Sequence, residues 1–179
     1  GLFFAGYFFV NGIAMPFFPV WLQARGFSDA EIASIIAIPM ALRVAVSPLG
    51  GMIADRTPTR RFAIRLFVLP AAPVFLLAWW VEGFWPILLL TGGAFTIWQL
   101  AMPGAEALAL TGSRHFGADY GRMRLGASAG FITANLGSGA LLGLLPVDAI
   151  FWFMFGGLVV AVAVSFILPR TPARVRALD

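Results

Sequence analysis

The chain has 179 residues, of which 60% are hydrophobic and only 11% are charged, and its formal net charge is +4 at pH 7. A water-soluble domain carries about 25% charged residues, and a chain of this length could not bury so much apolar surface, which excludes an ordinary soluble fold. All 12 basic residues are arginines, most of them between apolar runs, so the positive charge indicates a membrane protein rather than a partner of nucleic acid.

Six apolar segments follow one another, and each is long enough to cross a ~30 Å hydrocarbon layer as a helix of about 20 residues. The sequence therefore predicts an all-α membrane protein with one six-helix transmembrane bundle over residues 1–179. The first segment lacks a basic flank and a cleavage site, which favours a helix over a signal peptide. Because the chain begins at Gly1 without Met, we expect a fragment or a processed form. The expected helices span residues 2–24, 29–54, 62–81, 86–110, 120–145 and 149–168.

The first two segments carry polar residues and prolines inside apolar runs. Asn11, Pro16 and Pro19 interrupt the first segment, which leaves open a kinked packing helix or a helix that lines a cavity. Ser28 and Glu31 have the spacing of a capping box, which marks the start of the second segment.

Arg43 lies near the middle of the second segment, too deep for its side chain to reach the membrane surface. Two interpretations stay open: a structural ion pair, for which Glu106 is a candidate, or a counter-charge for an anionic substrate.

Two further charges lie inside apolar segments, and we expect them to meet. Glu106 lies roughly 10 Å inside the segment that ends near Ser113, and Arg124 lies roughly 7–8 Å inside the segment that starts after Asp119, at about 1.5 Å per residue. An ionised group at the bilayer centre costs at least ~2.5–3.5 kcal/mol, so such groups usually pair or face a cavity. Gln99 is predicted to share the helical face of Glu106, next to Trp98.

The fifth segment has small residues at intervals of four, which favours close packing of this helix against a neighbour. The stripe consists of Gly126, Gly130, Ala134 and Ser138.

The stretch from Gly51 to Arg61 resembles the loop between the second and third helices of the major facilitator superfamily. Gly51, Asp55, Arg56 and Arg60 match that pattern, whereas Pro58 and Thr59 replace a glycine and a basic residue. Glycine in this pattern allows helices to pack closely. The resemblance assigns these four residues to a contact that one conformation of a transporter breaks.

The region from Glu106 to Arg124, with Gly121-Arg-Met-Arg124, resembles the lactose permease and phenylpropionate permease group of that superfamily, as does Pro16–Leu22. The resemblance implies the amino-terminal six-helix half of a twelve-helix transporter. It matches Glu106 and Arg124 to residues that contact the solute, and it places Phe131 where lactose permease has a tryptophan that stacks on sugar. An arginine in the middle of the second segment, such as Arg43, resembles the pattern of the phenylpropionate permeases. This resemblance favours an aromatic or other small carboxylate as the solute over a sugar.

The resemblance thus implies a secondary active transporter, a proton-coupled symporter that works by alternating access, whose proton site would lie in a second half. We expect Arg124 and Arg43 to bind an acidic or hydroxylated solute, with Glu106 and Gln99 as polar partners and Phe131 and Trp98 as apolar surface. The alternatives are a symporter for oligosaccharides or nucleosides and a non-transporting membrane interaction module. No enzyme, metal site, cofactor or nucleic-acid partner is expected.

The expected partners are the lipid bilayer, the solute, and the second six-helix half or another copy of the chain. Arginines in the loops predict that both termini lie in the cytoplasm, and the resemblance implies a protein of the bacterial inner membrane. The loops on the basic side contain Arg56, Arg60, Arg61, Arg65, Arg114, Arg122, Arg170, Arg174 and Arg176, and those on the other side contain Arg25, Asp29, Glu31, Glu82 and Asp148.

Overall fold

A computed structural model describes residues 2–117 and 119–169, and in this part of the chain all regular structure is helical. The predicted all-α architecture is confirmed. The helices are α1 (Leu2–Ala24), α2 (Asp29–Arg56), α3 (Arg60–Leu77), α4 (Phe84–Gln99), α5 (Ala101–Phe116), α6 (Tyr120–Leu142) and α7 (Ala149–Ser165).

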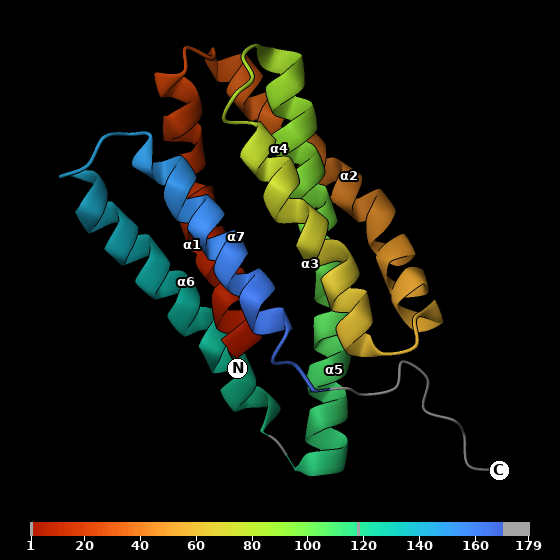
Figure 1. Ribbon diagram of the computed structural model, residues 1–179. Helices are drawn as coiled ribbons and strands as arrows, with labels where there is room; N and C mark the ends of the chain where they lie inside the picture. The colour runs from red at the N-terminus through yellow and green to blue at the C-terminus, as the bar shows by residue number, and fades with distance from the viewer. Residues whose placement is uncertain (1, 118, 170–179) are drawn as a thin grey trace.

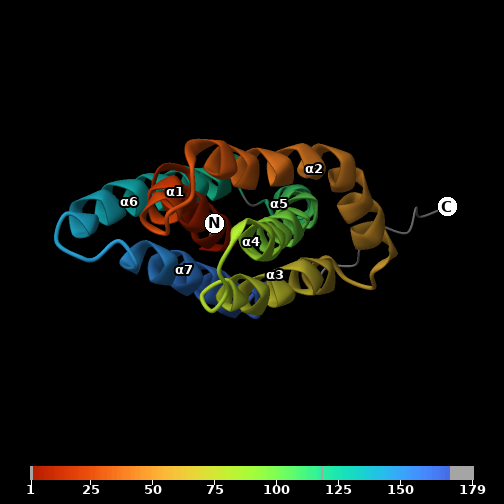
Figure 2. The same ribbon diagram turned by 90° about the horizontal axis from the view of Figure 1, so that it is seen from above.

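Successive segments run in alternating directions, with α4 and α5 in line as one rod (Figure 1). Seen from above, α2 and α6 lie along one side of the bundle and α3 and α7 along the other, with α4 and α5 between them (Figure 2). The start of α1 and the end of α7 lie at the same end of the bundle, where α2 leads into α3 and α5 into α6. The described arginines of the basic loops therefore gather at one end, whereas Arg170, Arg174 and Arg176 lie outside the described residues.

Four described stretches are long and apolar enough to cross a membrane, namely residues 2–24, 29–56, 84–114 and 120–142. α7 is apolar but has only 17 residues, and α3 has 18 residues with three arginines near its start. The predicted ends of several helices are displaced by a few residues. α6, for example, ends at Leu142 with Gly143 as its C-cap, and not at residue 145, where the following Pro146 disfavours a helical conformation.

The helix predicted over residues 86–110 is interrupted only at Leu100, between α4 and α5, which continue in line as one apolar span over residues 84–114. Pro103 has no N–H, so the carbonyl of Gln99 loses its usual helical partner. The Leu100 N–H is shared between the carbonyls of Thr96 (3.3 Å) and Ile97 (3.1 Å), which tightens the chain at this point.

The small-residue stripe packs α6 closely against α1, as predicted. A Cβ on Gly130 would collide with the backbone carbonyl of Ala5, and a Cβ on Gly12 would lie 2.5 Å from the carbonyl oxygen of Phe131. Ala134 and Ser138 are buried on the same face of α6. This contact holds α1 against α6 and so places the start of α1 beside the residues of the candidate site.

The capping box predicted at Ser28 and Glu31 is also confirmed. The Ser28 hydroxyl accepts a hydrogen bond from the Glu31 N–H, and the Glu31 carboxylate accepts one from the Ser28 N–H at 2.9 Å. This cap fixes the first residue of α2, and with it the rotational position of Arg43 four turns further along the helix.

Candidate functional site

Glu106 of α5 and Arg124 of α6 form an ion pair, so the predicted contact between them is confirmed. One oxygen of Glu106 accepts from Arg124, and the other accepts from the hydroxyl of Tyr120 at 2.6 Å. The short turn between the helices sets this register: Gly117 adopts φ 62°, and the Asp119 side chain caps α6 by accepting from the Arg122 N–H at 3.1 Å. The pair is partly accessible, with 45% of the Arg124 side chain and 26% of the Glu106 side chain exposed.

A pocket opens beside this ion pair on the surface of α6 and α1. Arg124 and Phe131 both line it, so the structure brings together two of the residues singled out in the sequence. The remaining lining residues are Phe8, Gly121, Leu125, Ala127, Ser128 and Ile132. A guanidinium next to an aromatic ring can hold a polar group of a solute while the ring covers an apolar part.

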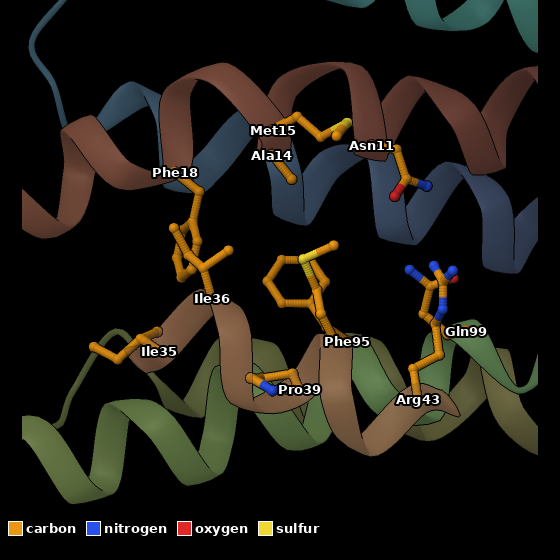
Figure 3. A pocket seen from close by; sticks show the side chains of 11 residues that line it. Asn11, Ala14, Met15, Phe18, Ile35, Ile36, Pro39, Arg43, Phe95 and Gln99 are labelled. Carbon is orange, nitrogen blue, oxygen red and sulfur yellow. The ribbon is translucent and has the colours of Figure 1, made fainter. Parts of the chain in front are cut away.

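Arg43 lines a second cavity of about 210 Å³ between α1, α2 and α4. Figure 3 shows its two different ends: the side chains of Arg43, Gln99 and Asn11 lie together at one end, and Phe18, Ile35 and Ile36 lie at the other, with Phe95 between them. Ala14, Met15, Pro39 and Met40 complete the lining. The cavity therefore offers a cationic, polar end and an apolar end to the same molecule.

The ion pair considered for Arg43 with Glu106 does not form, because the two carboxylate oxygens of Glu106 are taken by Arg124 and Tyr120. Among the described residues, no carboxylate lies within ion-pairing distance of Arg43 and no acceptor forms a hydrogen bond with it. Among the described residues Arg43 thus has no counter-charge, and it is the one charged residue of α2 between Ile32 and Ala54.

Gln99 and Trp98 contact α1 through Tyr7, a residue that the sequence did not single out. The Tyr7 hydroxyl donates to the Gln99 side-chain oxygen at 2.8 Å, and the Tyr7 ring stacks on Trp98 with ring centroids 4.8 Å apart. Trp98 is only 1% exposed and lies in the core, so it lines neither pocket, and its ring contacts Tyr7. The sequence did contain a signal for Tyr7: it is a tyrosine in a phenylalanine-rich run, one helical turn before Asn11. A buried phenol needs a hydrogen-bond partner, so such a tyrosine indicates a polar contact inside the bundle.

Gln99 and Glu106 bind different partners. Gln99 contacts Tyr7 of α1, and Glu106 contacts Tyr120 and Arg124 of α6, the helix that packs against α1.

The four residues of the loop motif lie together at the end of α2 and the start of α3. Asp55 and Arg60 form an ion pair at 2.8 Å, and Arg56 is exposed. The close packing expected at Gly51 is wrong, because a Cβ there would meet nothing within 4 Å; its neighbour Gly50 packs against Leu100 instead, where a Cβ would lie 2.8 Å from Leu100 Cδ2.

In residues 2–117 and 119–169, no group of three His, Asp or Glu side chains could hold a metal ion. The polar chemistry described above consists of hydrogen bonding and ion pairing, which suits the binding of a solute.

Comparisons with known proteins agree with this arrangement. A family model described as "MFS_1 like family" matches residues 1–177. Maltose permease of Geobacillus stearothermophilus is 31% identical over 173 residues, which cover 96% of this chain and 44% of that protein. A probable 3-phenylpropionic acid transporter of Escherichia coli (strain K12) is 32% identical over 141 residues, which cover 76% of this chain and 36% of that protein. The chain thus spans less than half the length of the curated relatives it matches.

Proposed function

Because the chain belongs to the MFS_1 like family, we propose that it forms the amino-terminal half of a secondary active transporter for a small organic solute. Its 179 residues would form one six-helix bundle that works with a second such bundle, supplied by a longer protein or by another copy of the chain. The two bundles would rock around a solute site near the middle of the membrane. The two relatives are named as a permease and a transporter, which supports a transport function over an enzymatic one.

The ion pair of Glu106 and Arg124 is the observation that carries the proposal. A carboxylate and a guanidinium inside apolar helices are costly to place in a membrane unless they pair or serve a solute. Here they pair, yet both side chains stay partly exposed, and Arg124 lines a pocket together with Phe131. Arg124 would donate to an acidic or hydroxyl group of the solute through its planar set of N–H groups, and Glu106 would orient Arg124 or accept a solute hydroxyl.

An acid with an apolar body is the proposed solute class. Arg43 lacks a counter-charge among the described residues, and its cavity has aromatic walls from Phe18 and Phe95. A bound carboxylate would supply the missing charge. A sugar is the second candidate, supported by the relative that is a maltose permease and by the ability of Glu106 and Arg124 to bind hydroxyls.

Coupling to protons and a place in the bacterial inner membrane belong to the same proposal. The coupling proton would bind in the second half, with no other cofactor. The basic ends of α2, α3, α5 and α6 lie at one end of the bundle, which supports a cytoplasmic location for that end and for both termini. Asp55, Arg56 and Arg60 would form a contact there that breaks and re-forms during transport, with Gly51 in the same loop.

Uptake into proteoliposomes tests the proposal. The Glu106→Gln and Arg124→Ala variants should reduce solute uptake by at least about tenfold, since a hydrogen bond to a charged group contributes about 1.5–3 kcal/mol. Arg122→Ala is the matched control, because its side chain is exposed on the same helix two residues away. Membrane insertion of all three variants should equal that of the wild type.

Normal uptake by both variants of the ion pair would refute this assignment of the site. Failure of the wild-type protein, together with its second half, to move any solute would instead favour a membrane interaction module.

A further inference from the structure

The polar end of the Arg43 cavity has many hydrogen-bond donors and few acceptors. Arg43 carries five N–H groups and no acceptor. Asn11 uses one of its side-chain N–H groups on the carbonyl of Tyr7 at 3.0 Å, which leaves its oxygen as a single acceptor. The third polar residue, Gln99, could present either its oxygen or its N–H groups to the cavity. Its orientation therefore decides whether donors outnumber acceptors at this end of the cavity.

Tyr7 fixes that orientation. Its hydroxyl donates to the Gln99 oxygen at 2.8 Å, which occupies the acceptor and leaves the two N–H groups of the Gln99 amide. Among the described residues, no acceptor forms a hydrogen bond with those N–H groups, and Gln99 lines the cavity next to Arg43 (Figure 3).

Tyr7 is itself held rigidly. The residue is 2% exposed, and its ring stacks on Trp98 with an angle of 5° between the ring planes and also lies edge-on to the ring of Phe8. The phenol cannot turn away without breaking this stack, so the Gln99 amide is held from outside the cavity by a residue that does not line it.

We propose that Tyr7 is a specificity-determining residue: by holding the Gln99 amide with its N–H groups toward Arg43, it makes the cavity select an apolar monocarboxylate over a neutral analogue. This inference rests on the proposed function and names the solute class for the Arg43 cavity. The carboxylate lies between Arg43 and Gln99, where donors face its two oxygens, and the apolar body lies along Phe95 toward Phe18. Tyr7 acts through Gln99 and does not touch the solute.

Binding of three probes to the protein, purified and reconstituted in nanodiscs, tests this role of Tyr7. The probes are 3-phenylpropionate, the uncharged 3-phenylpropionamide of nearly the same shape, and maltose. The wild type should bind the acid more tightly than the amide by at least about tenfold, which corresponds to ~1.4 kcal/mol. Arg43→Ala should remove this preference, because Arg43 is the only cation among the described residues that line the cavity.

Tyr7→Phe keeps the ring stack and removes the hydroxyl. Gln99 can then turn its oxygen into the cavity, where it repels a carboxylate and accepts from an amide, so the preference for the acid should fall about tenfold. Thr91→Val is the matched control, because it also removes a buried hydroxyl of this region, one that bonds only its own helix at the Ile87 carbonyl. This control should keep the wild-type preference.

Gln99→Met provides a second test if Tyr7→Phe does not fold. It removes the donors, so acid binding should weaken about tenfold while amide binding changes little. Equal weakening of acid and amide in Tyr7→Phe would overturn the inference, since that is the result of a purely structural role. Wild-type binding of maltose with no binding of either aromatic probe would also overturn it and leave the proposed transporter intact. The proposed function itself fails only if no solute is transported.

Discussion

Replacement of Gly130 by alanine should loosen the contact between α1 and α6. The new Cβ would collide with the carbonyl oxygen of Ala5 and would lie 2.9 Å from the carbonyl carbon and Cα of that residue, whereas ordinary contact begins at 3.4 Å, so the two helices must part by more than about half an ångström. The obstacle is backbone, which cannot rotate away as a side chain can. Such overpacking costs about 1–3 kcal/mol.

Alanine also favours the helix over glycine by about 0.5–1 kcal/mol, which offsets part of that cost. Gly137 on the same helix provides the control, because a Cβ there would meet nothing within 4 Å. Gly137→Ala should therefore stabilise the chain slightly, and the two variants should differ in free energy of unfolding by about 1–3 kcal/mol. Unfolding in detergent by added SDS, followed by tryptophan fluorescence, measures this difference. Equal stability of the two variants would refute the close contact of α1 and α6.

Two arginines in apolar surroundings should behave differently. Arg25 donates to two carbonyls of the α3–α4 connection at 3.0 Å each and lies over two tryptophan rings, so Arg25→Ala should lower the free energy of unfolding by about 1–3 kcal/mol. Arg43→Ala should not lower it, because Arg43 has no ion-pair or hydrogen-bond partner to lose among the described residues. The same SDS titration compares the two variants, and equal losses would contradict the account of Arg43. The exposed ion pair of Asp55 and Arg60 should contribute no more than about 1 kcal/mol to stability, so Asp55→Asn should leave unfolding nearly unchanged yet slow solute uptake if the pair belongs to the transport cycle. Normal uptake by Asp55→Asn would exclude that role.

Sequence reasoning located the Glu106–Arg124 contact because this contact depends on local geometry. The two residues lie at similar depth on consecutive antiparallel helices, and a fixed rise per residue makes that depth countable. The partner of the second carboxylate oxygen, Tyr120, lies on the same helix as Arg124, one turn before it. A phenol at that position has no sequence pattern that distinguishes a hydrogen-bonded role from a place at the membrane surface.

The interruption of the helix at Leu100 could not be predicted from the sequence. Prolines occur inside α1, α2 and α3 without ending those helices, so Pro103 alone does not predict an interruption. The structure adds the packing of Gly50 against Leu100, a contact between residues 50 positions apart.

The sequence by itself determined the class of the protein, because the length and apolar character of the segments, the cap at Ser28 and the depth of each charge are properties of one helix or one hairpin. Only the tertiary structure decided which side chains share a cavity. Tyr7 and Gln99 are 92 residues apart, and their contact depends on how α1 and α4 are rotated when they pack. Rotation of a helix that is apolar on all sides is not encoded in its hydrophobic pattern. It follows from close contacts with several neighbours at once, such as those of Gly12 and Gly50, and these exist only in the assembled bundle.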